Sequence, residues 1–446
     1  LEVFGTTSTA GVSTLANSGL KKHSLFSKGN QAPDKNILGG ASDLVLLYHS
    51  PQFDGYTAEQ LIPYLAYVDK DGNIKDTLFD SFLFLLSGKF PSGLSGWSES
   101  KASDWKWTIT DLFTEGENIL ALEEAAGQVK EALGLDDNYK YGFTVTLYYP
   151  NPKLTDFGDF DGDGKNDLLS DDATRLRALE WYMEIFEEKL AEYDFKNIEF
   201  RGYYWYDEAV YPEENKPYIV TETSKIVHNR GYDFFWIPYY TATGFSSWES
   251  FGFDIACMQP NYVFKVEEPY SRIPQAAYLT QLYGMGIEIE ISAKSFTNDI
   301  LYRKYLEYLS GGVLYGYMKD CVHMYYQDTL VYYDAATSKD ESIRQIYDYT
   351  YQFIKGTLDV YPDKLDEIKL TVQKGTALSG VIMENAPSYL AFEINSMPEQ
   401  GTVSVATDGT FTYYAPADFT GTVSFTYTYT EGLCDSEPCT ITITVE

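Results

Sequence analysis

Carboxylates follow strand-forming residues in two short segments of the chain. GYYWYDEAV covers residues 202–210 and contains Glu208, and GMGIEIEIS covers residues 284–292 and contains Glu288 and Glu290. Aromatic and β-branched residues favour β-strands, and barrel enzymes carry their chemistry at the carboxyl ends of strands. Two carboxyl groups about 5 to 5.5 Å apart can hydrolyse a glycosidic bond with retention, one as acid/base and one as nucleophile. The segments therefore predict a hydrolase with Glu208 and Glu290 as its catalytic pair.

Other assignments of these carboxylates stay open at the level of the sequence. Glu288 and Glu290 are two residues apart, so both point to one face of a strand, where one of them could line the core beside a Lys or Arg. Asp207 and Glu288 are the substitutes for the predicted pair. An inverting hydrolase would hold its two carboxyl groups about 6.5 to 9.5 Å apart.

Aromatic and amide side chains occur at the ends of the other expected strands. Rings stack on the C–H faces of sugars and amides bind hydroxyl groups, so such residues suit a carbohydrate cleft. A core role is the alternative for each of them. The predicted substrate-binding residues are Tyr48, His49, Tyr149, Trp205, Tyr206, Trp236, Tyr239, Gln259, Asn261, Tyr262, Glu288 and Tyr317.

The segment DFDGDGKND, residues 159–167, has the spacing of a calcium loop. Alternating Asp residues converge on a hard cation, and Gly164 permits the tight turn. Ser170 stands where an EF-hand has its twelfth-position Glu, and Asp171 or Asp172 could substitute. A solvated acidic turn is the alternative to a structural Ca²⁺. The predicted ligands are Asp159, Asp161, Asp163, the Lys165 carbonyl and Asp167.

Alternating strand-like and helix-like blocks supply the elements that would position these residues. The runs DLVLLYH, DSFLFLL, YGFTVTLYY, NIEFRGYYWY, DFFWIPYY, DIACMQPNY, GIEIEIS and GGVLYGYM predict strands. Stretches such as NILALEEAAGQVKEALG carry apolar residues at helical spacing. Eight apolar strands separated by helices predict an α/β fold, a (β/α)8 TIM-like barrel over residues 41–361. A doubly wound open sheet is the alternative.

The two ends of the chain differ from this pattern. Residues 1–40 are rich in Ser, Thr, Gly and Lys without periodicity, which predicts a leader or an irregular arm. Beyond about Pro362, short alternating runs broken by DG and TG turns predict a small all-β sandwich over residues 366–446. Cys434 and Cys439 flank the turn DSEP and could pair in an oxidising compartment.

The net charge of the chain indicates which classes of binding partner are favoured. The chain has 33 basic and 66 acidic residues, for a net charge of −33. This field repels phosphate backbones and anionic membranes, so it disfavours nucleic acid and favours a neutral or cationic substrate; solubility alone is the alternative explanation. No apolar run approaches the roughly 18 to 20 residues of a membrane span.

Two resemblances extend this interpretation. The passage GTVSVATDGTFTYYAPADFTGTVSFTYTYTEG resembles the bacterial Ig-like and cadherin-like modules of surface proteins, which implies contact with the cell surface or with polysaccharide and no catalytic role. The combination of LVLLYHSPQFDGYTAEQLIPYLAYVDKDG, LFDSFLFL, YYWYDEAV, FDIACMQPNYVF and GIEIE resembles an uncharacterised family of secreted bacterial barrel domains, a domain of unknown function, over residues 43 to about 361. This second resemblance implies a glycosidase-like barrel.

The placement of the carboxylates is also similar to that in the large retaining clan of (β/α)8 glycoside hydrolases. In that clan the acid/base Glu follows the fourth strand and the nucleophile ends the seventh, which implies these roles for Glu208 and Glu290. The clan usually has Asn before its acid/base Glu, whereas Asp207 occupies that place here. We therefore expect a secreted or cell-surface bacterial glycoside hydrolase acting on a polysaccharide or oligosaccharide. The alternative is a non-catalytic carbohydrate-binding or adhesive surface protein.

Overall fold

A closed barrel of parallel strands forms the larger part of the molecule. The computed structural model describes residues 27–96 and 99–446, so most of the predicted N-terminal arm lies outside the described residues. β1 pairs in parallel with both β4 and β10, which closes the sheet. The predicted (β/α)8 TIM-like barrel is confirmed, and the open-sheet alternative is wrong. In spatial order the barrel strands are β1 (Asp43–His49), β10 (His323–Tyr326), β9 (Gly286–Glu290), β8 (Ile255–Met258), β7 (Asp233–Trp236), β6 (Ile198–Trp205), β5 (Tyr141–Leu147) and β4 (Ser81–Leu86).

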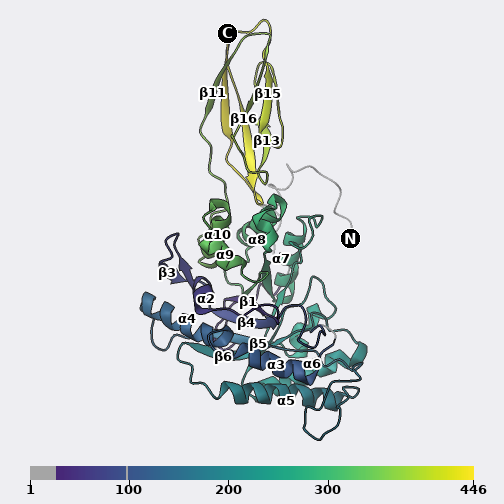
Figure 1. Cartoon of the computed structure of the whole chain (residues 1–446). Coiled ribbons are helices and arrows are strands. Elements are labelled where there is room, and N and C mark those ends of the chain that lie inside the picture. Colours follow the sequence, from purple (N-terminus) through teal and green to yellow (C-terminus); the bar gives the residue numbers. More distant parts are fainter. Residues whose placement is uncertain (1–26, 97–98) are drawn as a thin grey trace.

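Helices cover the outside of the barrel (Figure 1). Four of them begin at side chains that accept hydrogen bonds from free backbone N–H groups. These capping residues are Thr57 before α2, Asp171 before α5, Asn298 before α8 and Asp340 before α10. Short 3-10 helices η2 (Glu213–Asn215), η3 (Phe245–Phe251) and η4 (Ala293–Phe296) and the hairpin β2 (Ala66–Val68) with β3 (Ile74–Thr77) lie in the connections. The helices are α2 (Ala58–Leu65), α3 (Ala102–Leu112), α4 (Asn118–Leu133), α5 (Asp172–Leu190), α6 (Lys216–Asn229), α7 (Arg272–Tyr283), α8 (Asp299–Tyr315), α9 (Val331–Thr337) and α10 (Glu341–Ile354). Among the described residues, no helix has the length and apolar character that crossing a membrane requires.

The eighth strand was predicted in the wrong place. The run GGVLYGYM lies mainly in the last turns of helix α8, and the strand is the following HMYY of β10. Gly311 and Gly312 occur in the helix because it packs closely there: a Cβ on either would come within 2.6 Å of the side chain of Ile273, Tyr317 or Phe353. The sequence pattern gives no sign of this packing, since apolar residues with glycine also suit a buried strand.

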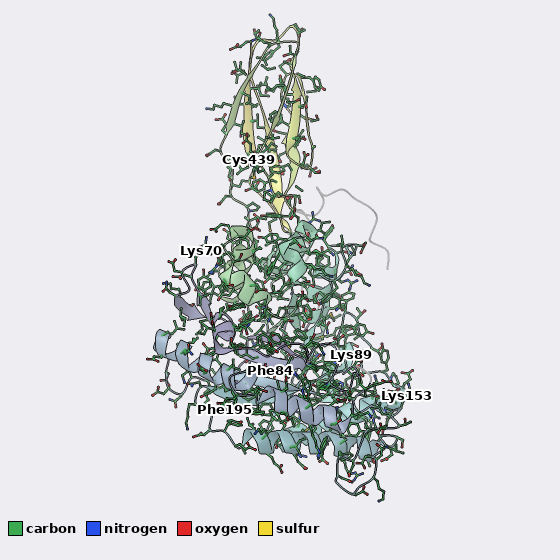
Figure 2. The ribbon with its side chains drawn as sticks, in the orientation of Figure 1. Lys70, Phe84, Lys89, Lys153, Phe195 and Cys439 are labelled. Carbon is green, nitrogen blue, oxygen red and sulfur yellow. The ribbon has the colours of Figure 1, made fainter. Side chains whose placement is uncertain are left out.

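Buried polar groups lie at the amino ends of the barrel strands. His323 Nδ1 lies 3.1 Å from Asp43 Oδ1, and Tyr325 donates to the same oxygen at 2.7 Å. Burial lowers the pKa of His323, but its contacts with Cys321 and Asp43 outweigh this and raise it to about 10. Most of the barrel core is apolar; Phe84 of β4, labelled in Figure 2, is fully buried.

A second, all-β unit projects from one end of the molecule, next to helices α8 and α10 (Figure 1). One sheet has the order β11-β18-β16-β13, with β17 paired to β16, and the other has the order β12-β15-β14. The two sheets enclose their own core, so the predicted Ig-like module is confirmed. Cys434 and Cys439 are buried free thiols, and Cys439 is labelled in Figure 2. The strands are β11 (Ile368–Val372), β12 (Ala377–Val381), β13 (Ala391–Ser396), β14 (Thr402–Val405), β15 (Thr410–Tyr414), β16 (Gly421–Glu431), β17 (Cys434–Asp435) and β18 (Cys439–Val445).

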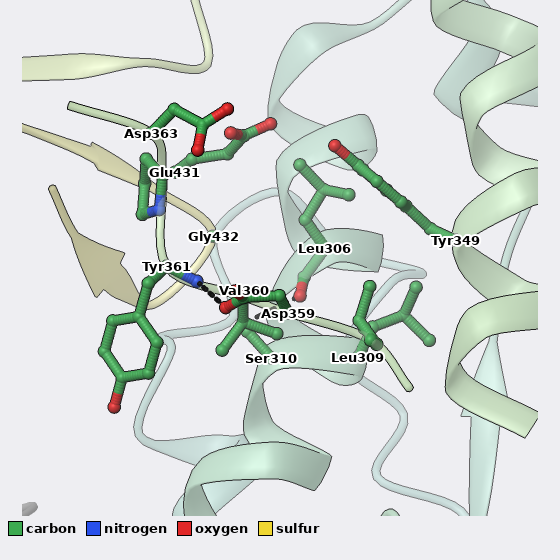
Figure 3. Close-up of a pocket in the computed structure, with 12 residues that line it drawn as sticks. Leu306, Leu309, Ser310, Tyr349, Asp359, Val360, Tyr361, Asp363, Glu431 and Gly432 are labelled. Carbon is green, nitrogen blue, oxygen red and sulfur yellow. Dashed lines mark hydrogen bonds between the residues drawn. The ribbon is translucent and has the colours of Figure 1, made fainter. Parts of the chain in front are cut away.

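The Ig-like module docks on helix α8 of the barrel. The rings of Tyr302 and Tyr389 lie 4.8 Å apart between centroids, and the backbone N–H of Leu433 donates to Ser310 Oγ at 3.3 Å. A cavity of about 230 Å³ lies between α8, α10, the linker and the end of β16. Figure 3 shows the carboxyl groups of Asp363 and Glu431 close together at one side of this cavity.

Candidate active site

A cavity of about 360 Å³ opens at the carboxyl ends of the barrel strands. Glu208, from the loop after β6, and Glu288, from β9, both face it, and these strands are three places apart in the barrel order. The described lining contains no Lys, Arg or His. Its members are Leu46, Tyr48, Leu85, Leu86, Ser87, Gly88, Tyr204, Tyr206, Glu208, Ile237, Gln259, Asn261, Phe264, Glu288 and Tyr326.

Strand alternation explains which residues of β6 reach the cavity. Tyr204 and Tyr206 line it, and the intervening residues point outward. Tyr203 donates to Glu187 of helix α5 at 2.9 Å, and Trp205 packs against Phe234 with ring centroids 6.1 Å apart. Glu208 therefore follows a strand whose outward face is held against helix α5 and strand β7.

Burial raises the pKa of Glu208 to about 7. A hydrogen bond from Gln259 opposes this rise, and the nearby charges of Asp207 and Glu290 add to it. Asp207 forms an ion pair with Lys216, and its carbonyl accepts from Trp236 Nε1 at 2.8 Å. A carboxyl group with such a pKa can both give and take a proton near neutral pH.

Glu290 is completely buried and does not line the cavity. Its Oε1 accepts from the backbone N–H of Asn261 at 2.9 Å, and its Oε2 accepts from the N–H of Tyr262 at 3.0 Å and from the hydroxyl of Tyr308. The N–H of Val263 is a further donor. Burial raises the pKa of Glu290 to about 7 although these hydrogen bonds lower it.

Glu288 is close enough to both of the other carboxyl groups to feel their charges. Burial raises its pKa well above the ordinary value, the charges of Glu290 and Glu208 raise it further, and it is hydrogen-bonded to Glu290. Three carboxyl groups this close cannot all be ionised at neutral pH, because each charge disfavours the next in a poorly solvated site. The cluster therefore holds at least one proton, which suits acid–base chemistry.

Amide side chains connect the two sides of this cluster. Gln259, which hydrogen-bonds Glu208, donates from Nε2 to the carbonyl of Ile237 at 2.8 Å and accepts from Asn261 Nδ2 at 3.0 Å. Asn261 Oδ1 accepts from the N–H of Tyr240 at 2.9 Å. The orientations of Gln259 and Asn261 are thus fixed by the chain around them.

The cavity brings together some of the predicted substrate-binding residues with others that the sequence analysis missed. Tyr204 could have been found from its period-two relation to Tyr206, and Tyr326 from the correct eighth strand, whereas Phe264 lies in a loop with no pattern. The remaining missed residues are the small or apolar side chains of the lining. The predicted residues that line the cavity are Tyr48, Tyr206, Gln259, Asn261 and Glu288.

The other predicted residues lie outside the lining. His49 faces away from the cavity side of β1, with Nδ1 2.9 Å from Asp111 Oδ2. The hydroxyl groups of Tyr239 and the exposed Tyr211 form a hydrogen bond of 2.8 Å. Tyr317 follows helix α8 and its carbonyl lies 2.6 Å from Nε2 of His323, the first residue of β10, which is the opposite end of the barrel.

The remaining aromatic residues that were predicted to bind substrate pack against other side chains or form hydrogen bonds with them. Tyr149 accepts from Arg175 at 2.9 Å, Trp236 stacks on Phe253 with ring centroids 5.2 Å apart, and Trp205 packs outward as described above. Tyr262 contributes its backbone N–H to Glu290, and its hydroxyl donates to Glu307.

The predicted calcium loop lies between β5 and α5. Ligand oxygens of Asp159, Asp161 and Asp167 lie within 4.8 Å of one another. Oxygens around Ca²⁺ sit about 2.3 to 2.6 Å from the ion, so these three carboxylates fit one cation. Asp163 instead pairs with the Lys165 ammonium at 2.9 Å and lies outside this group of three.

Comparison with known proteins gives two matches to family models. Residues 43–352, more than half of the chain, match a model described as "Domain of unknown function (DUF4855)". Residues 359–444 match a model described as "Bacterial Ig domain". No curated protein matches the sequence.

Solved structures of similar fold include several glycoside hydrolases. A tri-modular GH5 (subfamily 4) endo-beta-1,4-glucanase from Bacillus licheniformis, complexed with cellotetraose, is 11% identical over 93% of this chain and 80% of that chain, with a TM-score of 0.39. A GH113 beta-1,4-mannanase is 12% identical over 73% and 98%, with a TM-score of 0.37. An endo-fucoidan hydrolase from glycoside hydrolase family 107 is 11% identical over 91% and 80%, with a TM-score of 0.35. Similarity this low carries no argument about chemistry, which depends on the site itself.

Proposed function

The chain belongs to the family described as "Domain of unknown function (DUF4855)", and from the geometry of its barrel we propose that it is a secreted glycoside hydrolase. One observation carries this proposal: Glu208 and Glu288 face a single cavity at the carboxyl ends of the strands. Burial raises the pKa of each, so that a carboxyl group able to protonate a leaving oxygen is present near neutral pH. Two carboxyl groups that share a cleft are what glycoside hydrolysis requires.

The proposed roles follow from where each group lies. Glu208 protonates the departing oxygen and later removes a proton from water, since its pKa of about 7 suits both steps. Glu288 attacks the anomeric carbon, which gives retention of configuration. We place this role on Glu288, the substitute in the sequence analysis, because Glu290 is enclosed by hydrogen-bond donors and does not line the cavity.

The substrate we propose is a neutral or cationic polysaccharide or oligosaccharide. The described lining contains carboxyl groups and no cation, so a sulfate or uronate would meet only like charge there. Phe264 is 47% exposed and its ring lies edge-on to that of Tyr326, with centroids 5.0 Å apart. Together they offer apolar surface on which a sugar ring can stack.

Two proposals concern the rest of the chain. Ca²⁺ held by Asp159, Asp161 and Asp167 would stiffen the loop between β5 and α5. The Ig-like module would contact the cell surface or the polysaccharide and would take no part in catalysis, which agrees with the absence of its residues from the cavity lining.

An activity screen tests the function. Wild type, Glu208→Gln and Glu288→Gln are incubated with neutral, amino and anionic glycans, and the anomer first released is identified by NMR. We expect cleavage of a neutral or amino glycan by wild type with retention, and a loss of at least about 100-fold in each variant. Glu115→Gln is the matched control, because Glu115 is exposed in the loop before α4.

The outcomes separate the candidate functions. Cleavage that survives both substitutions would refute the catalytic assignment. Binding of a glycan by wild type and both variants, with cleavage by none, would make the protein a carbohydrate-binding surface protein.

A further inference from the structure

Glu290 has no oxygen free to meet a substrate. Each of its carboxylate oxygens accepts at least one hydrogen bond, from the N–H groups of Asn261 and Tyr262 and from the hydroxyl of Tyr308. An attacking oxygen must approach a carbon to about 3 to 3.5 Å along an open path. A fully buried side chain with both oxygens occupied does not offer one. The hydrogen-bond donors around Glu290 therefore serve a role other than nucleophilic attack.

Two parts of the fold hold the donors around Glu290 in place: the loop after β8 and helix α8. Asn261 adopts a left-handed backbone conformation, with φ of 52°, at the turn where successive N–H groups point toward Glu290. Consecutive N–H groups at such a turn form a concave anion site. On helix α8, the ammonium of Lys304 donates to the carbonyls of Tyr262 at 3.0 Å and Glu268 at 3.0 Å, which holds the same loop against the helix that carries Tyr308.

The hydrogen bond between Glu288 and Glu290 requires a shared proton. The two side chains lie two residues apart on one face of β9, and both are buried. Two ionised carboxylates in contact there would repel each other, so one of them is protonated. Donors surround Glu290 and stabilise its charge, which places the proton on Glu288.

We propose that Glu290 is a positioning residue that accepts the proton of Glu288 as Glu288 attacks the substrate. The O–H bond of Glu288 breaks and its proton passes to Glu290, while the freed carboxylate forms a bond to the anomeric carbon. The bond from that carbon to the leaving oxygen breaks, and the leaving oxygen takes the proton of Glu208. When water releases the sugar, Glu208 takes a proton from the water, and Glu288 regains its own from Glu290. This inference rests on the proposed function.

Glu208 is the other group near the pair that titrates close to neutral pH. It faces the pair from the loop after β6, and burial raises its pKa to about 7. Burial also raises the pKa of the remaining neighbours well above neutral, so they stay uncharged. These neighbours are Tyr48 of β1, Tyr204 of β6, Cys257 of β8, Tyr326 of β10, Tyr308 of α8 and Tyr332 of α9.

Infrared titration of the free protein tests the shared proton without any substrate. At neutral pH, wild type should show protonated carboxyl bands of Glu288 and Glu208; the difference spectrum between wild type and Glu288→Gln identifies the Glu288 band, and Glu208→Gln identifies the other. In Glu290→Gln the midpoint of the Glu288 band should move down by about one pH unit or more, because the neighbouring charge is gone. An unchanged midpoint would overturn the inference. Tyr308→Phe removes one hydrogen-bond donor to Glu290 and little volume. The charge of Glu290 is then less stabilised and holds the Glu288 proton more strongly, so the midpoint of the Glu288 band should move up. This variant replaces Glu290→Gln as the test if Glu290→Gln does not fold.

Covalent trapping tests the division of roles. With an activated 2-fluoro glycoside of a cleaved sugar, peptide sequencing by mass spectrometry should find the sugar on Glu288. Glu290→Gln should still be labelled and should show the acid limb of its pH–rate profile at lower pH. A label on Glu290 would overturn the inference while leaving the hydrolase intact. A positive infrared result without cleavage of any glycan would refute the proposed function and the proton transfer during attack, and would leave only the shared proton of the free protein.

Discussion

Replacing Asp207 with Asn should lower the pH at which activity is lost on the alkaline side. Glu208 must be protonated to assist the leaving group, so kcat/KM should fall above its pKa of about 7. The charge of Asp207 raises that pKa, and removing it also leaves the Lys216 ammonium without its carboxylate partner. For charges ~8 Å apart at an effective dielectric constant of ~20, the interaction is about 2 kcal/mol, or roughly 1.5 pKa units. The alkaline limb should therefore move to about pH 5.5.

The assay is a pH–rate profile of kcat/KM on a glycan that wild type cleaves. Glu213→Gln makes the same change of charge at an exposed position of the loop after β6, and solvent screening should leave its profile close to that of wild type. An alkaline limb in Asp207→Asn that stays in place, or moves to higher pH, would refute Glu208 as the acid.

Three further predictions concern other parts of the chain. Asp161→Asn should abolish the stabilisation by Ca²⁺, which for wild type should reach about 2.7 kcal/mol at one hundred times the Kd; thermal melts with Ca²⁺ and EDTA that show no difference would contradict the site. His323 has a pKa of about 10 when folded, above its ordinary 6.5, so the stability it contributes is fully present below pH 6.5 and is lost as the pH rises to 10. Urea melts should show that the free energy of unfolding falls over this pH range in wild type and not in His323→Gln. The same pH dependence in both proteins would contradict a contribution from His323. Phe264→Ala should raise KM several-fold and change kcat little, if the ring stacks on substrate; an unchanged KM on every cleaved glycan would remove it from the binding surface.

The barrel was predictable because its strands are buried on both faces. Such strands appear in the sequence as nearly continuous apolar runs, and seven of the eight predicted runs contain the observed strands. The eighth failed for a reason outside local sequence. Gly311 and Gly312 allow helix α8 to approach its neighbours closely, and the true strand has only His323–Tyr326 to mark it.

The carboxylates of the site were predictable as a group, but their separate positions were not. Glu288 and Glu290 share a strand face, and the sequence gives no way to rank them. The difference between them comes from Asn261, in a loop after another strand, and from Tyr308, on a helix further along the chain. The proposed calcium loop differs, because all of its carboxylates lie within one short segment and its spacing alone led to the prediction. Even there, the pairing of Asp163 with Lys165 was not evident from the spacing.

Helix α8 makes the barrel and the Ig-like module parts of one mechanical path. Tyr302 and Ser310 contact the module, and Tyr308, between them on the helix, holds Glu290. The module projects away from the helices of the barrel (Figure 1). Tension applied to the module, by a polymer strand or by an anchor on a cell, would enter the barrel through the linker to α10 and through α8. Force on the module would thus act directly on helix α8, whose Tyr308 donates a hydrogen bond to the buried Glu290.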